Sequence, residues 1–332
     1  MVFENYKYMV SIRCMTFNQS KYIFDALNGF VIQRTNFPYV IMVMDDASTD
    51  GEQEIIKDFI SKQFNINDTI VAYEKETEYA HIIYAQHATN SNCYITALFL
   101  KENHYSQRKG KLTYLSEWRD KCKYEAICEG DDYWIDPLKL QKQVDFLERN
   151  PNYGLVCSEI NLYKQESNTL HYTFFKKKKK WKIKYTFDDF IINAWFLAPC
   201  TWLYRIEFVT DEIESKKFII GDLPLLLNIS GQSKVKFMDE PMAVYRELLK
   251  SASHGFNFMQ QVKYRKGVLR IQSYYIGKFN KQHLAKKILC RWVLIMAKIA
   301  YNYKEYLMLF SYIIEYVKYC LHLKADDLDS VN

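Results

Sequence analysis

Residues 39–50 read YVIMVMDDASTD, an apolar run rich in strand-forming residues that ends in two aspartates and a polar turn. A strand that is apolar on both faces is typical of the interior of a parallel sheet that helices cover. Ligands of such sheets bind outside the carboxyl ends of the strands, where Asp45 and Asp46 fall. The run therefore predicts a central strand with a functional edge directly after it.

The segments around this run predict alternating strands and helices. Residues 8–15 alternate as a strand does, and residues 20–34 carry apolar side chains at helical spacing. We expect a helix at about 52–63 and a strand at about 69–73, whereas residues 77–123 show no regular pattern. This order predicts a doubly wound, mostly parallel α/β sheet of the nucleotide-binding type.

A second acidic pair follows residues 124–128, which read YEAIC and also predict a strand. Asp131 and Asp132 stand just after it, so both acidic pairs are expected at the same edge of the sheet. One pair can bond a base or a ribose, while the other can hold a divalent cation that neutralises a pyrophosphate. Alternatively, these aspartates only cap the helices that follow them, as the turn from Asp46 to Asp50 would allow.

The composition indicates a folded globular protein of one large or two ordinary domains, since the 332 residues are 49% hydrophobic and 25% charged. The eight cysteines include no CxxC pair, so we expect reduced thiols and neither a zinc site nor a redox motif. The first residues lack the pattern of a secretory signal, and no apolar run reaches the roughly 18 residues of a membrane span. We therefore expect a cytoplasmic protein.

Positive charge is concentrated in the C-terminal part of the chain. The net charge is +6, and residues 255–332 contain 13 Lys/Arg against 5 Asp/Glu. The rest of the chain is slightly acidic, which argues against a nucleic-acid partner and for a local surface contact of the tail. Residues 258–323 have helical periodicity with wide apolar faces. We expect a helical appendage that lies on the cytoplasmic face of a membrane, pairs with a second copy, or packs on its own domain.

The motifs together resemble those of the family 2 glycosyltransferases, whose fold is of the GT-A type. The resemblance covers roughly residues 8–254 in the family's order and spacing. It separates a domain of residues 1–254 from a helical region of residues 255–332. The stretches ENHYSQ and EGDDYW resemble the branch that builds capsule and lipopolysaccharide. The matching motifs are TFN at 16–18, DDASTD at 45–50, ENHYSQ at 102–107, EGDDYW at 129–134, PCT at 199–201, GDLPL at 221–225 and YR at 245–246.

The resemblance implies a metal-dependent, inverting transferase of the hexosyltransferase type. It would move a sugar from a nucleotide-diphosphate sugar, with UDP as the expected nucleotide, to a glycan or lipid-linked saccharide in bacterial surface polysaccharide synthesis. It would work in the cytoplasm or peripherally at the inner face of the cell membrane. A divalent cation, Mn²⁺ or Mg²⁺, would be held by Asp132 with Asp131 beside it. Asp222 would act as the general base toward the acceptor hydroxyl.

The same resemblance assigns the other site residues. His254 would be a third ligand to the metal or phosphate, or else a plain surface or core histidine. The residues that would bind the nucleotide are Thr16, Phe17, Asn18, Asp46 and Asp131. The residues that would line the pocket for sugar and acceptor, unless they only pack the core, are Tyr133, Trp134, Thr201, Tyr245 and Arg246.

The sequence departs from the family pattern at four places. Ala47 stands where the family has glycine, and Gly221 precedes Asp222 where an acidic residue is common. Leu248 replaces a histidine after the Tyr-Arg pair. Residues 107–123 are inserted relative to the family, which leaves the donor-side loop undefined.

Two other classes of protein remain as alternatives. A nucleotidyltransferase that makes sugar nucleotides should carry a glycine-rich N-terminal loop, and residues 10–21 contain no glycine. An inactive scaffold that binds sugar nucleotides should have lost Asp132 or Asp222, and the chain keeps both. Hydrolysis of UDP-sugars in the presence of Mn²⁺ separates the three classes.

Overall fold

The computed structural model describes residues 6–107, 109–177, 185–194, 197–210, 218–249 and 257–322. The chain divides into two compact units. The first comprises Met1–Lys184, Leu197–Thr210 and Val235–Glu247, and the second comprises Tyr185–Phe196, Asp211–Lys234 and Leu248–Asn332. The second unit thus combines the expected helical region with two segments from within the expected domain of residues 1–254.

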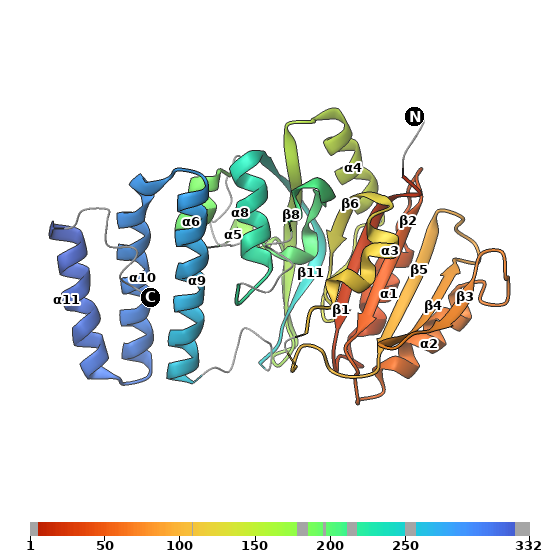
Figure 1. The fold of residues 1–332 in the computed structure, drawn as a ribbon, viewed down its shortest axis with the longest axis horizontal. Coiled ribbons are helices and arrows are strands. Elements are labelled where there is room, and N and C mark those ends of the chain that lie inside the picture. The colour runs from red at the N-terminus through yellow and green to blue at the C-terminus, as the bar shows by residue number, and fades with distance from the viewer. Residues whose placement is uncertain are drawn as a thin grey trace. The chain divides into compact units, whose positions relative to one another are not determined.

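The first unit is built on a mixed sheet whose centre is parallel (Figure 1). Its parallel strands lie side by side in the order β5-β2-β1-β6. Their bounds are Tyr8–Thr16 for β1, Tyr39–Asp45 for β2, Cys93–Leu100 for β5 and Cys122–Ile127 for β6. Every residue of β2 is buried, as expected for an apolar run at the centre of a sheet. The α/β fold with a mostly parallel sheet is therefore confirmed.

Antiparallel strands extend the sheet on both sides, and its full order is β3-β4-β5-β2-β1-β6-β10-β8-β11-β7. Strand β9 pairs with β8, and β7 pairs with β11 through Tyr133 and Val244. The second acidic pair, which directly precedes β7, therefore lies close to the end of β11. The bounds are β3 Tyr73–Glu76, β4 Ala80–Gln86, β7 Tyr133–Trp134, β8 Tyr153–Lys164, β9 Thr169–His171, β10 Leu203–Arg205 and β11 Lys234–Glu247.

The sequence assigned no strand to several of these segments, β4 and β5 among them, and it misplaced β3. Strands β4 and β5 lie within residues 77–123, and β5 is a central parallel strand. The strand predicted at about 69–73 is displaced, because residues 69–71 form a turn and β3 begins only at Tyr73. All four residues of β3 are exposed, and three of them are charged. An edge strand of this kind carries no apolar periodicity, so the pattern could not locate it.

Helix α1 (Ile23–Val31) follows β1 and holds β7 in place. A Cβ atom on Gly29 would lie 2.8 Å from the backbone nitrogen of Trp134, so the helix and the strand approach more closely than any side chain allows. The other helices of this unit are α2 (Glu52–Gln63), α3 (Ser116–Arg119), α4 (Lys139–Arg149) and α5 (Phe174–Lys177), with 3-10 turns at Leu112–Leu115, Pro199–Thr201 and Ile206–Phe208.

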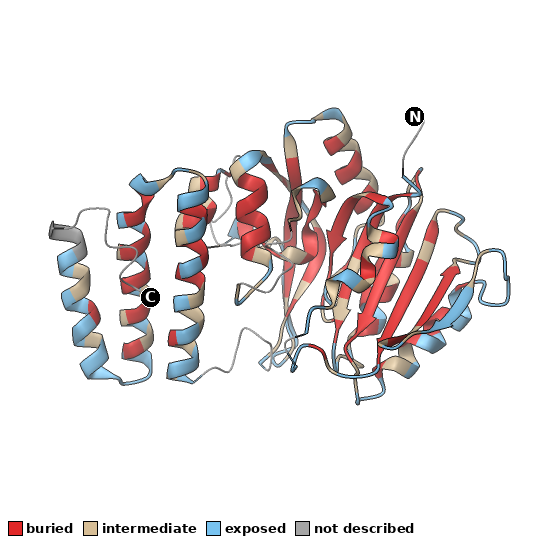
Figure 2. Cartoon of the chain, in the orientation of Figure 1, coloured by how far each residue is buried: buried red, intermediate tan, exposed pale blue. Residues whose placement is uncertain are grey.

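The described part of the second unit is mainly helical, with a 3-10 turn at Gln282–Leu284. Helix α10 packs on both α9 and α11, which confirms the predicted helical character of the tail over its described residues. No helix among the described residues is long and apolar enough to cross a bilayer. The central strands of the first unit are buried, whereas most of α11 is exposed (Figure 2). The bounds are α6 Phe187–Asn193, α8 Asp222–Gln232, α9 Phe258–Lys278, α10 Ala285–Asn302 and α11 Tyr306–His322.

Candidate functional site

The turns that follow β1 and β2 are hydrogen-bonded to each other. The backbone nitrogen of Asn18 donates to Ser48 Oγ at 2.8 Å, and Asn18 Oδ1 accepts from the nitrogen of Thr49 at 2.8 Å. The nitrogen of Ser20 donates to Asp50 Oδ2 at 2.9 Å. The carboxyl ends of the two strands therefore form one continuous polar surface, which we call the polar floor (residues 16–20 and 46–52).

Glu52 is the buried centre of the polar floor. Its Oε2 accepts from the nitrogen of Gln19 at 2.8 Å and from Ser48 Oγ at 2.9 Å, while the hydroxyl of Thr16 donates to its Oε1. Burial raises the pKa of Glu52. Thr16 thus helps to hold Glu52 in the position from which Glu52 binds Gln19 and Ser48. No pattern in the sequence points to a function of Glu52, because an acidic residue in the first turn of a helix is common.

Two residues of the floor have left-handed backbone, Asn18 with φ of 53° and Ala47 with φ of 61°. Asparagine tolerates this region and glycine adopts it freely, whereas alanine does not. This backbone conformation explains why the related motif has glycine at the position of Ala47. Next to Asn18, Phe17 leaves 44% of its surface exposed, so its ring is accessible at the floor.

Asp46 is buried and is bound by the segment that follows β5. Its Oδ1 accepts from the backbone nitrogen of His104 at 2.8 Å, and its Oδ2 accepts from the nitrogen of Tyr105 at 3.0 Å and from Lys111 Nζ at 2.6 Å. Asp46 therefore connects the carboxyl end of β2 to His104, Tyr105 and Lys111. The inserted residues 107–123 contribute Lys111 to this contact, which the sequence did not predict.

Asp45, the neighbour of Asp46, is buried and bonds to the turn after β2 and to helix α2. Its Oδ2 accepts from the nitrogen of Ser48 at 3.1 Å and from Gln53 Nε2 at 2.6 Å. Its Oδ1 is buried and has no hydrogen-bond partner among the described residues. Burial raises the pKa of Asp45.

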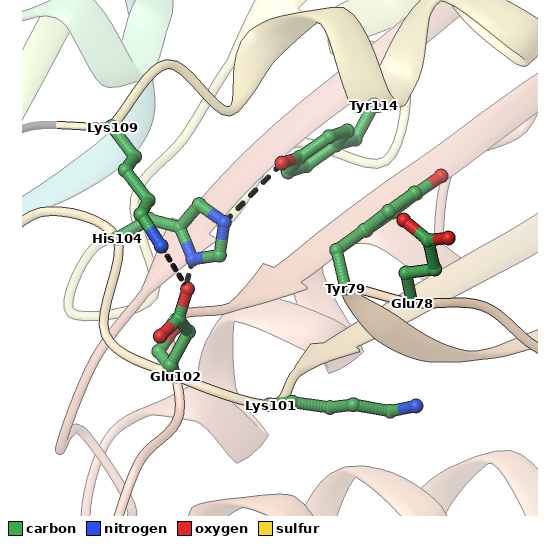
Figure 3. A pocket seen from close by; sticks show the side chains of 7 residues that line it. All are labelled: Glu78, Tyr79, Lys101, Glu102, His104, Lys109 and Tyr114. Carbon is green, nitrogen blue, oxygen red and sulfur yellow. Dashed lines mark hydrogen bonds and ion pairs between the residues drawn. The ribbon is translucent and has the colours of Figure 1, made fainter.

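A hollow of about 630 Å³ lies beside the segment that Asp46 holds (Figure 3). Its size is that of a site for a small molecule. On one side of it the rings of Tyr79 and Tyr114 are stacked, with their centroids 3.8 Å apart. His104 Nε2 lies 3.3 Å from the hydroxyl of Tyr114, and Lys109 pairs with Glu102. The sequence missed this pocket, whose lining residues are Glu78, Tyr79, Lys101, Glu102, His104, Lys109 and Tyr114.

The second acidic pair lies at the same sheet edge as the polar floor. The loop of residues 129–132, which carries this pair, is called the acidic loop. A Cβ atom on Gly130 would lie 2.5 Å from Thr16 Oγ1, so the acidic loop touches the polar floor directly. Asp132 is buried, and its Oδ1 accepts from the backbone nitrogen of Arg246 at 2.7 Å. Burial raises the pKa of Asp131, and burial together with the charge of Asp131 raises that of Asp132. A bound cation would remove this electrostatic cost.

Arg246 is a clamp on the acidic loop. Its Nε donates to the carbonyl oxygen of Asp131 at 2.8 Å, its Nη1 to Gln165 Oε1 at 2.9 Å, and its Nη2 to Asp25 Oδ2 at 2.7 Å. The guanidinium also lies 4.7–5.5 Å from three rings, those of Tyr22, Tyr133 and Tyr163. The sequence predicted Arg246 as part of the pocket wall, but its side chain is buried and engaged within the protein. The sequence missed its partners Asp25 and Gln165.

Trp134 and Thr201 pack the core, which corrects their expected place in the pocket wall. Trp134 is 2% exposed and donates from its indole nitrogen to the carbonyl oxygen of Cys200 at 2.7 Å. Thr201 is fully buried, and its hydroxyl donates to the carbonyl oxygen of Ala198 at 2.8 Å. Trp134 belongs to β7, which pairs with the distant β11, and Thr201 ends the 3-10 turn before β10, so local sequence could not separate a wall from a core position.

The two tyrosines of the predicted wall remain partly exposed, namely Tyr133 and Tyr245. Burial raises the pKa of Tyr245, and the charges of Asp132 and Asp131 raise it further. Tyr245 therefore lies within electrostatic range of the acidic pair.

Asp222 is the first residue of α8, in the second unit. Its Oδ1 accepts from the nitrogen of the next residue, Leu223, at 2.8 Å, and the N-cap position of α8 is Gly221, which makes no side-chain capping bond. Burial raises its pKa, and its charge raises the pKa of Tyr264 nearby. His254 lies outside the described residues. Within them, no group of three or more His, Cys, Asp or Glu side chains is arranged to hold a metal ion.

The fold is similar to that of known proteins, although no protein-family model matches the chain. A structure of S. aureus TarS, residues 1–349 in complex with UDP, superposes with a TM-score of 0.52 and 13% identity. The match covers 95% of this chain and 92% of that chain, and it shows the fold. Uncharacterised proteins of Mycobacterium tuberculosis and Mycobacterium bovis are 28% identical over 238 residues, 71% of this chain. The aligned residues span 58% of these relatives' length.

Proposed function

We propose that this chain is an inverting glycosyltransferase that moves a sugar from a nucleotide-diphosphate sugar to a glycan or lipid-linked saccharide. One observation carries the proposal. Strands β2 and β6 are the parallel neighbours of β1, and the acidic pairs that follow them meet the same turn after β1. This arrangement supports a nucleotide site and a cation site next to each other at the edge of the sheet where ligands of such folds bind. The motifs of the capsule and lipopolysaccharide branch support a role in bacterial surface polysaccharide synthesis.

The nucleotide would lie on the polar floor. The exposed ring of Phe17 would contact the base, and the Asn18 turn would contact base and ribose. Asp46 would act by holding the segment from His104 to Lys111 against the nucleotide, since its oxygens are bound there. UDP is the nucleotide we propose, because the related motifs favour it and TarS shares the fold in a complex with UDP.

Asp132 and Asp131 would hold a divalent cation, Mn²⁺ or Mg²⁺. The donor set fits such an ion, because it consists of carboxylate oxygens whose negative charge burial leaves poorly compensated. The remaining positions would be filled by diphosphate oxygens and water, as is usual for these ions. Bound there, the cation supplies charge stabilisation for the departing nucleotide diphosphate.

The protein's own groups would complete the transfer. Arg246 holds the acidic loop through its bond to the carbonyl oxygen of Asp131, and Tyr245 lies within electrostatic range of the acidic pair. Asp222 would accept the proton of the attacking hydroxyl. Its raised pKa makes it a stronger base than an exposed aspartate, which suits proton abstraction near neutral pH.

The proposal is tested by incubating the chain with UDP-, GDP-, CDP- and dTDP-sugars and Mn²⁺ and measuring release of nucleoside diphosphate. We expect release from one of them, and its loss in Asp132→Asn. Asp58→Asn, on the exposed face of α2, is the matched control and should behave as wild type. Release of pyrophosphate from a nucleoside triphosphate and a sugar phosphate would instead indicate a nucleotidyltransferase. Binding without turnover, with every acceptor and with water, would indicate a scaffold.

A further inference from the structure

Helix α11 carries apolar side chains on the side that faces away from the rest of its unit. Its inner side packs on α10, where the ring of Tyr312 meets that of Trp292 at 6.0 Å. On the outer side, Leu307 is 91% exposed and Phe310 is 69% exposed. The exposed residues recur at spacings of three and four, as one helix face requires. This apolar stripe consists of Tyr306, Leu307, Phe310, Ile313, Ile314 and Val317.

The apolar stripe is too continuous to be ordinary surface. Single exposed apolar residues need no explanation, but a contiguous apolar patch usually marks a contact with another molecule or a membrane. The stripe has no charged residue within it; Lys318 and Glu315 lie at its border. Figure 2 shows α11 as exposed along most of its length.

The helices around the stripe are strongly basic. Residues 257–322 contain 12 Lys/Arg and only 2 Asp/Glu, Glu305 and Glu315. On α10, Lys287, Arg291 and Lys298 are exposed along one face. Neighbouring helices pack about 8–10 Å apart. This is close to the Debye length at physiological salt, so the positive charge acts at the stripe as well.

The charge decides which partner fits the stripe. A second copy of the chain would bring the same positive charge to the contact, and like charges oppose such pairing. An anionic lipid surface has the complementary charge, and its headgroup boundary accepts apolar side chains. Tyr301, Tyr303 and Tyr306 are exposed around the turn between α10 and α11. Tyrosine is enriched at the level of lipid headgroups.

We propose that α11 docks on an anionic membrane surface, with Leu307 and Phe310 inserted at the headgroup boundary and the basic residues of α10 over the headgroups. Because the inner side of α11 is packed on α10, the helix would lie along the surface with only its stripe in contact with lipid. This inference goes beyond glycosyl transfer and does not depend on it.

Vesicle sedimentation with the full chain tests the apolar part. We expect binding to vesicles that contain phosphatidylglycerol, weakened by added salt, and little binding to vesicles of pure phosphatidylcholine. The double variant Leu307→Ser/Phe310→Ser should lose this binding. The matched control is Ile70→Ser, which removes an apolar side chain that is 90% exposed in the first unit and should bind as wild type does.

A second pair of variants tests the charge. Lys287→Gln and Arg291→Gln should each weaken binding about fivefold, the usual effect of one cationic residue near an anionic surface. Lys62→Gln, an exposed lysine on α2, is the control and should have no effect. In Phe310→Trp, the added indole should shift its emission to the blue on anionic vesicles, and brominated acyl chains should quench it.

Several results would overturn the proposal. The wild-type chain would fail to bind anionic vesicles, or the Leu307→Ser/Phe310→Ser variant would bind them equally well while remaining folded by circular dichroism. A dimer in solution that this variant dissociates, with no vesicle binding by wild type, would assign the stripe to a second copy. Equal binding to neutral vesicles would contradict the proposed attraction between the basic residues and anionic headgroups. None of these results bears on release of nucleoside diphosphate, so the two proposals fail independently.

Discussion

Ala47 is a single residue whose backbone conformation conflicts with its side chain. With φ of 61°, it occupies the left-handed region, where a Cβ atom is unfavourable. We expect Ala47→Gly to raise the free energy of unfolding by roughly 0.5–1 kcal/mol, because relief of strain exceeds the added flexibility of the unfolded chain. Urea denaturation measures the change. Ala26→Gly, within helix α1, is the control and should lower the stability instead.

Asp132 combines a functional expectation with a cost in stability. Its pKa is raised in the folded state, so its ionisation destabilises the protein as pH rises from the unfolded carboxyl value of about 4 through the folded value. Asp132→Asn removes the ionisation and can still accept the hydrogen bond from the Arg246 nitrogen. We expect the variant to match wild type in acid and to become the more stable protein as pH rises, without Mn²⁺ present. Denaturation at several pH values checks this, and an advantage in acid alone would contradict it.

At the scale of elements, helix α1 and the acidic loop are connected through the side chain of Arg246. Asp25 on α1 pairs with Arg246, and Arg246 in turn donates from Nε to the carbonyl oxygen of Asp131 and from its backbone nitrogen to the carboxylate of Asp132. We expect Asp25→Ala to weaken Mn²⁺ affinity about tenfold, the lower end of the effect of outer residues on metal sites. Titration calorimetry with Mn²⁺ and UDP measures it. Asp58→Ala on α2 should leave the affinity unchanged, and an equal loss in both variants would show a general effect on stability.

The elements also show how far the sequence could lead. The strands around YVIMVMDD and YEAIC were predicted, because their apolar runs are continuous and their ends are acidic. Because β2 and β6 both run parallel to β1, the acidic pairs that follow them were expected at the same sheet edge as the turn after β1. The pairing of β7 with β11 is set by residues more than 100 positions apart, and no local pattern encodes it. That pairing buries Trp134 and brings Arg246 to the acidic loop, whereas the sequence left both the pocket wall and core packing open for these residues.

The polar floor illustrates a second limit of sequence reasoning. Thr16, Asn18 and Asp46 were expected to touch the nucleotide, and the structure places all three at the carboxyl edge. Their hydrogen bonds, however, go largely to other protein groups. Motifs indicate where such residues gather, whereas the division between contact and support depends on partners such as Glu52 and Lys111, which nothing in the motif specifies.

At the scale of the whole molecule, the residues proposed for donor binding and for proton abstraction belong to different units. The acidic pair lies in the first unit and Asp222 in the second. We expect Asp222→Asn to keep the rise in melting temperature that UDP-sugar and Mn²⁺ produce, because the donor site is intact. Transfer should fall by about 10²–10⁴, the usual contribution of a positioned general base. The loss should appear in kcat.

The structural alternative for Asp222 gives the opposite result. If the residue only caps α8, asparagine caps equally well and transfer should continue near the wild-type rate. Turnover assays on Asp222→Asn therefore decide between the two roles. Asp188→Asn, on the short helix α6 of the same unit, is a control for general effects of removing a carboxylate.

The ion pair between Asp25 and Arg246 connects the solvent-exposed face of α1 to the acidic loop. Half of Asp25 is exposed, while the guanidinium that it holds is buried. A small cyclic peptide or an antibody fragment with a cationic tip could compete for Asp25 from solvent without entering the pocket. As expected for Asp25→Ala, such a molecule would loosen the acidic loop and weaken Mn²⁺ affinity without occupying the proposed donor site. Resistance to it would then arise on helix α1, at positions that no substrate touches.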